Sequence, residues 1–152
     1  MNDFQTPTWI CKIMVDMIPG GVRTVLEPTP GDGNIVKALK GYKVTTPKDF
    51  WGVLGRFDAV VMNPPFTPMT LGYKFLYAVM GMTDIVIALM PWLVIINADK
   101  RTNDIIDYGL VSVTHLPRSK FPGTRVQPCI LQMIKGYCEE VNLYFAVKYK
   151  NE

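Results

Sequence analysis

Histidine and cysteine are scarce in this chain, which has one histidine, His115, and three cysteines among its 152 residues. Cys11, Cys129 and Cys138 are odd in number and widely spaced, which fits neither a disulfide framework nor a zinc site. A lone histidine supports no metal site either. We therefore expect no bound metal and a reducing, cytoplasmic setting.

Long apolar runs are also scarce. The longest, DIVIALMPWLVIINA at 84–98, is shorter than the ~20 residues that a membrane helix needs, and it contains Pro91. Its β-branched residues favour a buried strand followed by a loop or a second short element. The first residues, MNDFQTPTWI, lack a basic region followed by an apolar run, so we expect no secretory signal and no membrane partner.

The composition is that of an ordinary folded protein. Hydrophobic residues make up 49% of the chain and charged residues 19%, which argues against disorder. The net charge of +3 permits a polyanionic partner without requiring one. The length suits one domain over residues 1–152 with a sizeable core.

Helical and strand-like segments alternate along the chain. Helices are predicted at 6–18, 34–40, 69–82 and 99–109, with Thr6 as the N-cap of the first and Pro7 as its first helical residue. Strands are predicted at 23–28, 42–46, 57–63, 84–90, 110–116 and 129–137, and 142–150 is either an edge strand or a surface segment. This alternation predicts an α/β fold with a mostly parallel sheet and helices on both faces.

Two unusual turns follow strands of this sheet, at the edge where such sheets bind ligands. In LEPTPGDGN, Gly31 and Gly33 let the backbone turn sharply and approach a ligand, although Val36 stands where a dinucleotide fingerprint has its third glycine. Glu27 would repel a pyrophosphate but could hold an ammonium group. A turn that serves only to reverse the chain explains the two glycines equally well.

The second turn, NPPF, follows the apolar run FDAVVM. Pro64 and Pro65 stiffen the backbone and remove its N–H donors. The side-chain carbonyl of Asn63 and the backbone carbonyl of Pro64 could then accept from one amino group, while Phe66 offers a face for a planar ring. The alternative is a rigid turn with a packed aromatic residue.

Together these motifs resemble the S-adenosylmethionine-dependent amino-group methyltransferases. The resemblance rests on TP at 6–7, LEPTPGDGN, DF at 49–50, NPPF and LPRSKFPGTRVQPCIL, and it covers residues 4 to about 135. The motif order is similar to that of N6-adenine methyltransferases whose cofactor motifs precede the catalytic motif. The resemblance implies a Rossmann-like class I methyltransferase fold with S-adenosylmethionine as cofactor.

The resemblance also implies a role for each matching residue. Thr6 and Pro7 would lie near the methionine carboxylate of the cofactor, Glu27 at its ammonium group, Gly31 and Gly33 along its methionine and ribose, and Asp49 and Phe50 at its adenine. Asn63, Pro64, Pro65 and Phe66 would form the catalytic turn, which holds the target amine and stacks on its base. Phe121 resembles a second aromatic clamp on a flipped base. Arg118, Lys120 and Arg125 flank it and either contact phosphates or form a solvated face.

The chain also departs from this family. Thr45, Thr46 and Pro47 stand about where an acidic residue usually binds the cofactor ribose. The interval from Glu27 to Asp58 is short for two βαβ crossovers of ~30 residues each. We therefore expect the fold to be trimmed between strands 2 and 4, with a helix and a strand missing. Since no target-recognition segment is evident, specificity would come from loops, a homodimer or a separate partner protein.

These features predict methyl transfer to the N6 of adenine in DNA. RNA adenine and a protein glutamine amide suit the same turn and remain alternatives. An inactive, methyltransferase-like binding module is a further alternative, because the cofactor side is shortened.

Overall fold

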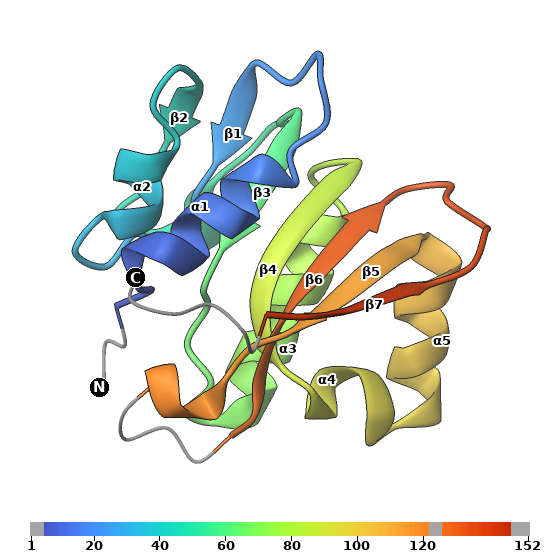
Figure 1. Cartoon of the computed structure of the whole chain (residues 1–152). Helices are drawn as coiled ribbons and strands as arrows, with labels where there is room; N and C mark the ends of the chain where they lie inside the picture. The colour runs from blue at the N-terminus through green and yellow to red at the C-terminus, as the bar shows by residue number, and fades with distance from the viewer. Residues whose placement is uncertain (1–4, 122–125, 147–152) are drawn as a thin grey trace.

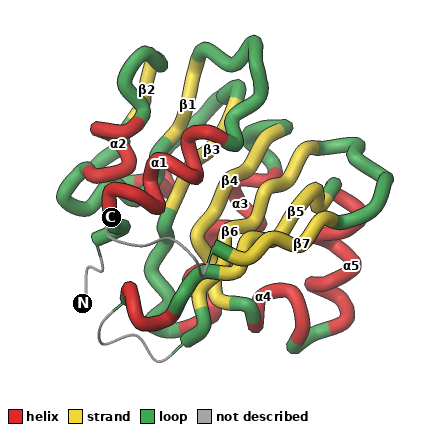
Figure 2. The backbone as a smooth tube through the Cα atoms, viewed as in Figure 1, coloured by secondary structure: helices red, strands yellow, loops and turns green. Residues whose placement is uncertain are grey.

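The computed structural model describes residues 5–121 and 126–146. Within these residues the chain forms one seven-stranded sheet with helices on both sides (Figures 1 and 2). The strands are β1 (Thr24–Leu26), β2 (Lys43–Thr45), β3 (Ala59–Met62), β4 (Ile85–Pro91), β5 (Leu110–His115), β6 (Pro128–Ile134) and β7 (Asn142–Phe145). The helices are α1 (Thr8–Asp16), α2 (Asn34–Ala38), α3 (Met69–Met80), α4 (Leu93–Ile96) and α5 (Asp99–Tyr108), with single 3-10 turns η1 (Phe50–Gly52) and η2 (Arg118–Lys120).

The strand order across the sheet is β2-β1-β3-β4-β6-β5-β7. Only β6 runs opposite to its neighbours β4 and β5, and the other pairs are parallel. The predicted mostly parallel sheet is therefore confirmed. The segment at 142–150, left open by the sequence, contributes β7 as an edge strand parallel to β5.

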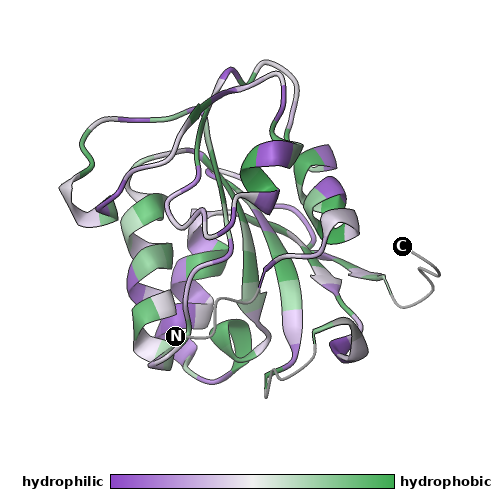
Figure 3. Ribbon diagram, turned by 90° about the vertical axis from the view of Figure 1, so that its left-hand side faces the viewer, coloured by the Kyte–Doolittle hydropathy of each residue, from purple (hydrophilic) through white to green (hydrophobic). Residues whose placement is uncertain are grey.

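Both faces of the central strands are buried, because the side chains alternate between two apolar clusters. Val60 and Met62 of β3 face the cluster that includes α3, and Ala59 and Val61 face the one that includes α1. All four residues of β3 are consequently buried. Figure 3 shows this layering, with mainly hydrophobic strands between helices that carry both hydrophobic and hydrophilic residues. Parallel strands covered on both faces are continuous apolar runs for this reason.

The sheet is shortened beside β2, as predicted. Only η1 lies between β2 and β3 along the chain, so β2 is the edge strand on that side of the described sheet. The connection from Thr45 to Ala59 thus contains no α-helix, the usual crossover between parallel strands. Thr45 ends β2, and no acidic side chain follows it before Asp49.

The start of α1 differs from the prediction. Pro7, not Thr6, is the N-cap, with extended backbone angles of φ −55° and ψ 146°, and the helix begins at Thr8. The Thr6 hydroxyl accepts a hydrogen bond from Asn63 instead of capping the helix. The Thr6 hydroxyl therefore bonds to Asn63, far away in the sequence, rather than to a backbone N–H at the start of α1.

The apolar stretch at 84–98 forms β4 followed by the short helix α4, as expected. Across residues 5–121 and 126–146, no helix is long and apolar enough to cross a membrane.

Candidate active site

The two predicted turns lie at the same edge of the sheet. β1 and β3 are parallel neighbours, so Glu27 and Asn63, which follow them, both lie at their carboxyl ends. β4 ends at Pro91 on this edge, and β6, which runs the other way, begins there at Pro128. The sheet topology therefore collects these turns in one place.

Glu27 is buried, with 0% of its surface exposed. Its Oε1 accepts from the backbone N of Thr29 at 2.7 Å and lies 3.3 Å from the Thr29 hydroxyl. Oε2 is also buried and has no hydrogen-bond partner within the described residues. Burial raises the pKa of Glu27 to about 7, although the hydrogen bonds from Thr29 act to lower it. A buried acceptor oxygen without a donor is suited to a ligand that brings a donor or a positive charge.

The glycine turn connects Glu27 to α2. Gly31 and Gly33 both adopt left-handed backbone angles, with φ of +53° and +88°. A side chain at Gly33 would meet no atom within 4 Å, whereas one at Gly31 would come within 3.1 Å of Gln5 Nε2. The left-handed conformation favours glycine at both positions, and at Gly31 the approach of Gln5 adds a steric reason. The turn holds Asn34 at the start of α2, and its Nδ2 donates to the backbone oxygen of Thr6 at 3.0 Å.

Asn63 is held through both its side chain and its backbone. Its Nδ2 donates to the Thr6 hydroxyl at 3.0 Å, and its backbone oxygen accepts from the Thr29 hydroxyl at 3.1 Å. Pro64 is buried beside it. Thr6, predicted to lie near a cofactor carboxylate, is thus in direct contact with the NPPF turn.

A pocket of about 50 Å³ adjoins Asn63. It is mostly apolar and lined by Asn63, Phe66, Leu89, Met90, Pro91, Phe121, Val126 and Pro128. Asn63 and Phe66 of the NPPF turn are therefore brought together with Phe121, which was predicted from a separate motif. Phe66 packs on Gly72 of α3, where a Cβ would lie only 2.3 Å from the Phe66 ring.

The residues assigned to the cofactor adenine lie on η1. Asp49 is exposed, and its Oδ1 accepts from the backbone N of Trp51 at 3.1 Å. Phe50 is only 7% exposed and packs against Phe75, with ring centroids 5.0 Å apart. Trp51 is 55% exposed and is the accessible ring here. The sequence interpretation missed it, although it directly follows the DF pair.

The basic residues near Phe121 are described only in part. Arg118 is exposed on η2. The side chain of Lys120 and the whole of Arg125 lie outside the described residues. Phe121 itself is buried, at 7% exposure.

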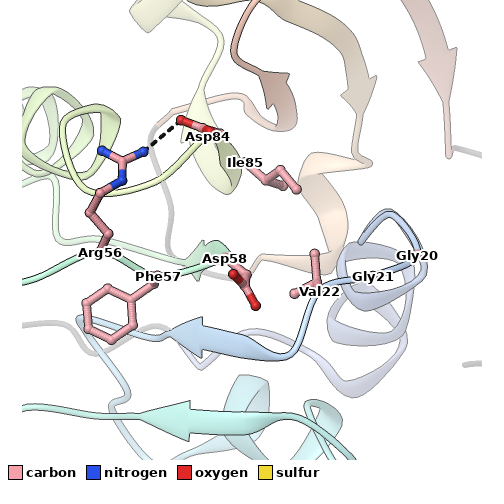
Figure 4. Close-up of a pocket in the computed structure, with 8 residues that line it drawn as sticks. All are labelled: Gly20, Gly21, Val22, Arg56, Phe57, Asp58, Asp84 and Ile85. Atoms are coloured by element: carbon pink, nitrogen blue, oxygen red, sulfur yellow. Dashed lines mark hydrogen bonds and ion pairs between the residues drawn. The ribbon is translucent and has the colours of Figure 1, made fainter.

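A larger pocket of about 390 Å³ lies at the opposite edge of the sheet, by the amino ends of β1, β3 and β4 (Figure 4). Its polar groups already have partners. Asp58 accepts from the backbone N of Arg23 at 2.8 Å, and Arg56 and Asp84 form an ion pair at 2.8 Å. Parallel sheets bind ligands at the other edge, so the smaller pocket beside Asn63 is the better candidate.

The two buried cysteines offer no alternative chemistry. Cys11 and Cys129 are buried, and burial raises the pKa of the Cys11 thiol to about 11 and that of Cys129 to about 12. Thiols that are protonated at neutral pH are poor nucleophiles. Among the described residues, no group of three or more His, Cys, Asp or Glu could hold a metal ion.

Solved methyltransferase structures share this fold. A candidate class I S-adenosylmethionine-dependent methyltransferase from Listeria monocytogenes has a TM-score of 0.75 and 15% identity, over 95% of this chain and 67% of that protein. The methyltransferase subunit of a type I restriction-modification system from Streptococcus thermophilus has a TM-score of 0.76 and 16% identity, over 99% of this chain and 49% of that protein. The modification subunit of a candidate type I restriction enzyme from Vibrio vulnificus has a TM-score of 0.73 and 15% identity, over 99% of this chain and 48% of that protein.

These likenesses establish the class I methyltransferase fold, as the sequence resemblance implied. The chain spans about half the length of the two type I subunits. No protein-family model and no curated protein matches the sequence.

Proposed function

We propose that this chain transfers a methyl group from S-adenosylmethionine to the exocyclic N6 amino group of adenine in DNA. The observation that carries the proposal is the meeting of Asn63, Phe66 and Phe121 around one pocket at the carboxyl edge of the sheet. An amide carbonyl next to aromatic rings can recognise an amine on a planar base. The type I modification subunits with the same fold favour DNA as the substrate.

The residues at the cofactor side fit S-adenosylmethionine in part. The buried and unpartnered Oε2 of Glu27 is an acceptor for the ammonium group of its methionine. Gly31 and Gly33 add no side chains of their own to the adjoining turn, and the exposed Asp49 and Trp51 can meet an adenine. Thr45 and Thr46 provide no carboxylate for the ribose, so we expect a modest affinity.

When bound, S-adenosylmethionine supplies a methyl group on positively charged sulfur, and the carbon–sulfur bond breaks as the carbon–nitrogen bond forms. Asn63 and Pro64 act by positioning, because their carbonyl oxygens accept the two N–H groups of the target amine. The surplus proton of the amine leaves to solvent, since neither carbonyl is a base. Phe66 and Phe121 hold the base in the orientation for attack.

The pocket has to open for a base to enter. Its volume of about 50 Å³ is well below the ~300 Å³ at which ligand pockets begin. A target in a duplex also has to leave the base stack. We propose that Phe66 and Phe121 separate to admit the flipped base.

The first test is labelled methyl transfer from S-adenosylmethionine to duplex DNA, structured RNA and a glutamine-containing protein mixture. We expect label in N6-methyladenine from DNA. Label in RNA adenosine or in glutamine would instead select one of the alternative substrates. Calorimetry would separate these outcomes from an inactive module, since no heat of cofactor binding at millimolar concentration would contradict every enzymatic assignment.

The type I proteins with the same fold are subunits of larger systems, and by analogy we propose that a partner protein or a second copy supplies sequence specificity here. The same transfer assay, with DNA of many sequences and the isolated chain, should show weak or unspecific methylation. Strong, sequence-specific methylation by the isolated chain would contradict the need for a partner.

A further inference from the structure

We propose that the hydroxyls of Thr6 and Thr29 are positioning groups, which together hold Asn63 in the orientation that accepts the target amine. This inference rests on the proposed function of Asn63. It assigns Thr6 a role other than the cofactor contact that its motif implied, and it gives Thr29 a role where the sequence suggested none.

Thr6 contacts the nitrogen end of the Asn63 amide. The Thr6 hydroxyl accepts from Nδ2 of Asn63 at 3.0 Å. This contact directs the amide nitrogen toward Thr6 and places the amide oxygen at the opposite end. An amide oxygen accepts from an amine, whereas an amide nitrogen can only donate. The reversed amide would present donors to a target that also donates.

Thr6 is itself held in place. It is 4% exposed, and its backbone oxygen accepts from Asn34 Nδ2 at 3.0 Å and from Cys11 Sγ at 3.5 Å. Asn34 begins α2 and Cys11 lies on α1. These contacts fix the backbone of Thr6 and so keep its hydroxyl beside the Asn63 amide.

Thr29 holds the backbone of Asn63. Its hydroxyl lies 3.1 Å from the Asn63 backbone oxygen and 3.3 Å from Glu27 Oε1. One hydroxyl has a single proton and donates to one acceptor at a time. Because the Thr29 backbone N–H already donates to Glu27 Oε1 at 2.7 Å, the shorter hydroxyl contact, to Asn63, is the one we assign.

The two contacts act at different points of the same residue. Thr29 fixes the backbone where the turn leaves β3, and Thr6 fixes the end of the side chain. Pro64 follows at once and restricts the turn further. A catalytic group held at both ends keeps its geometry, and a misplacement of ~1 Å can cost about 10²-fold in rate.

Thr6→Val and Thr29→Val keep the shape of each side chain and remove the hydroxyl. We expect each to lower kcat by about 10- to 100-fold, with cofactor Kd close to that of wild type. Thr6→Ser and Thr29→Ser restore the hydroxyl and should recover most of kcat. Thr70→Val, at an exposed position of α3, is the matched control and should behave as wild type.

A spectroscopic readout tests the contact without relying on activity. The side-chain NH₂ resonances of Asn63, identified by their loss in Asn63→Ala, should shift in Thr6→Val and return in Thr6→Ser. Unshifted resonances in a folded Thr6→Val protein would overturn the assignment. So would weaker cofactor binding with unchanged kcat, since Thr6 would then be a cofactor ligand. If wild type transfers no methyl group, the proposed function fails, whereas the NMR comparison still decides whether Thr6 orients Asn63.

Discussion

Glu27 and Thr29 form a tight turn in which only one of the two carboxylate oxygens is satisfied. Oε1 accepts from the Thr29 backbone N at 2.7 Å, and Oε2 is buried without a partner in the described structure. Ionisation of Glu27 is thus less favourable in the folded protein than in the unfolded chain. Two measurable effects of pH follow.

The first effect is on stability. Burial raises the pKa of Glu27 from its ordinary value of 4.5 to about 7. The unfolded chain therefore releases the proton at lower pH than the folded one. The free energy of unfolding should fall as pH rises from about 4.5 to about 7 and then level off, by up to about 3 kcal/mol from this group.

Urea denaturation at a series of pH values, with wild type and Glu27→Gln, would isolate this contribution. The variant should be the more stable protein above pH 7, and the difference should shrink toward pH 4. Parallel stability curves for the two proteins would show that Glu27 does not titrate in this way.

The second effect is on cofactor binding. An ionised Glu27 attracts an ammonium group, so affinity for S-adenosylmethionine should rise about tenfold per pH unit below pH 7 and flatten above it. Calorimetry on Glu27→Gln should give weaker binding without this rise. Asp107→Asn, at an exposed position of α5, is the control and should keep the wild-type profile.

Asn63→Ala removes the proposed side-chain acceptor. Methyl transfer should fall by at least about 10²-fold, as when a single positioned polar group is lost from an active site. Cofactor binding should remain largely intact, because Glu27 and the glycine turn are unchanged. Loss of cofactor binding in this variant would contradict the role assigned to Asn63.

Gly72→Ala tests the position of Phe66. Alanine usually stabilises a helix interior by about 1 kcal/mol relative to glycine. Here its Cβ would lie 2.3 Å from the Phe66 ring and 3.1 Å from the Pro65 oxygen, so the ring has to move. We expect lower transfer activity without the usual gain in stability.

Gly81→Ala, at the C-cap of the same helix, is the matched control. Its Cβ would meet the Ala78 oxygen at an ordinary 3.5 Å, and activity should not change. Equal activity of the Gly72 and Gly81 variants would exclude Phe66 from the proposed mechanism.

Gly109→Ala tests the packing behind the site. Gly109 ends α5 with φ of +139°, and a Cβ there would lie 1.9 Å from the backbone oxygen of Ile134. Since a backbone atom cannot move aside cheaply, we expect a loss of at least about 2 kcal/mol by thermal or urea unfolding. Gly20→Ala, which meets no atom within 4 Å, should be close to neutral; similar stability of both variants would refute the clash.

The buried strands and the stiff NPPF turn could be predicted because they depend on residues close together in the sequence. The apolar runs around Val60 and Ile87 specify buried strands, and Pro-Pro after Asn63 specifies a stiff turn, because these preferences act within a few residues. The short interval from Glu27 to Asp58 likewise indicated the missing crossover. Thr6 was assigned as an N-cap on the same local grounds, and that was wrong because its hydroxyl binds Asn63, 57 residues away.

Some residues of the candidate site could not be identified from their neighbours in the sequence. Thr29 lies inside a motif that was recognised, but its contact with Asn63 spans 34 residues. Gly72 could have been noticed, since glycine in a helix interior is unfavourable unless something requires it. Trp51 is distinguished only by its exposure, which depends on Phe50 and Phe75 filling the core beneath it.

The sequence by itself determined the alternation of strands and helices and the identity of the two turns, because backbone preference and apolar periodicity are local properties. Only the tertiary structure decided that β6 lies antiparallel between β4 and β5, and that Phe121 meets Phe66 and Asn63 at one pocket. Those outcomes depend on strand pairing and side-chain packing between segments far apart in the chain. The stabilising free energy comes from apolar surface that several elements bury together, so no single segment determines it.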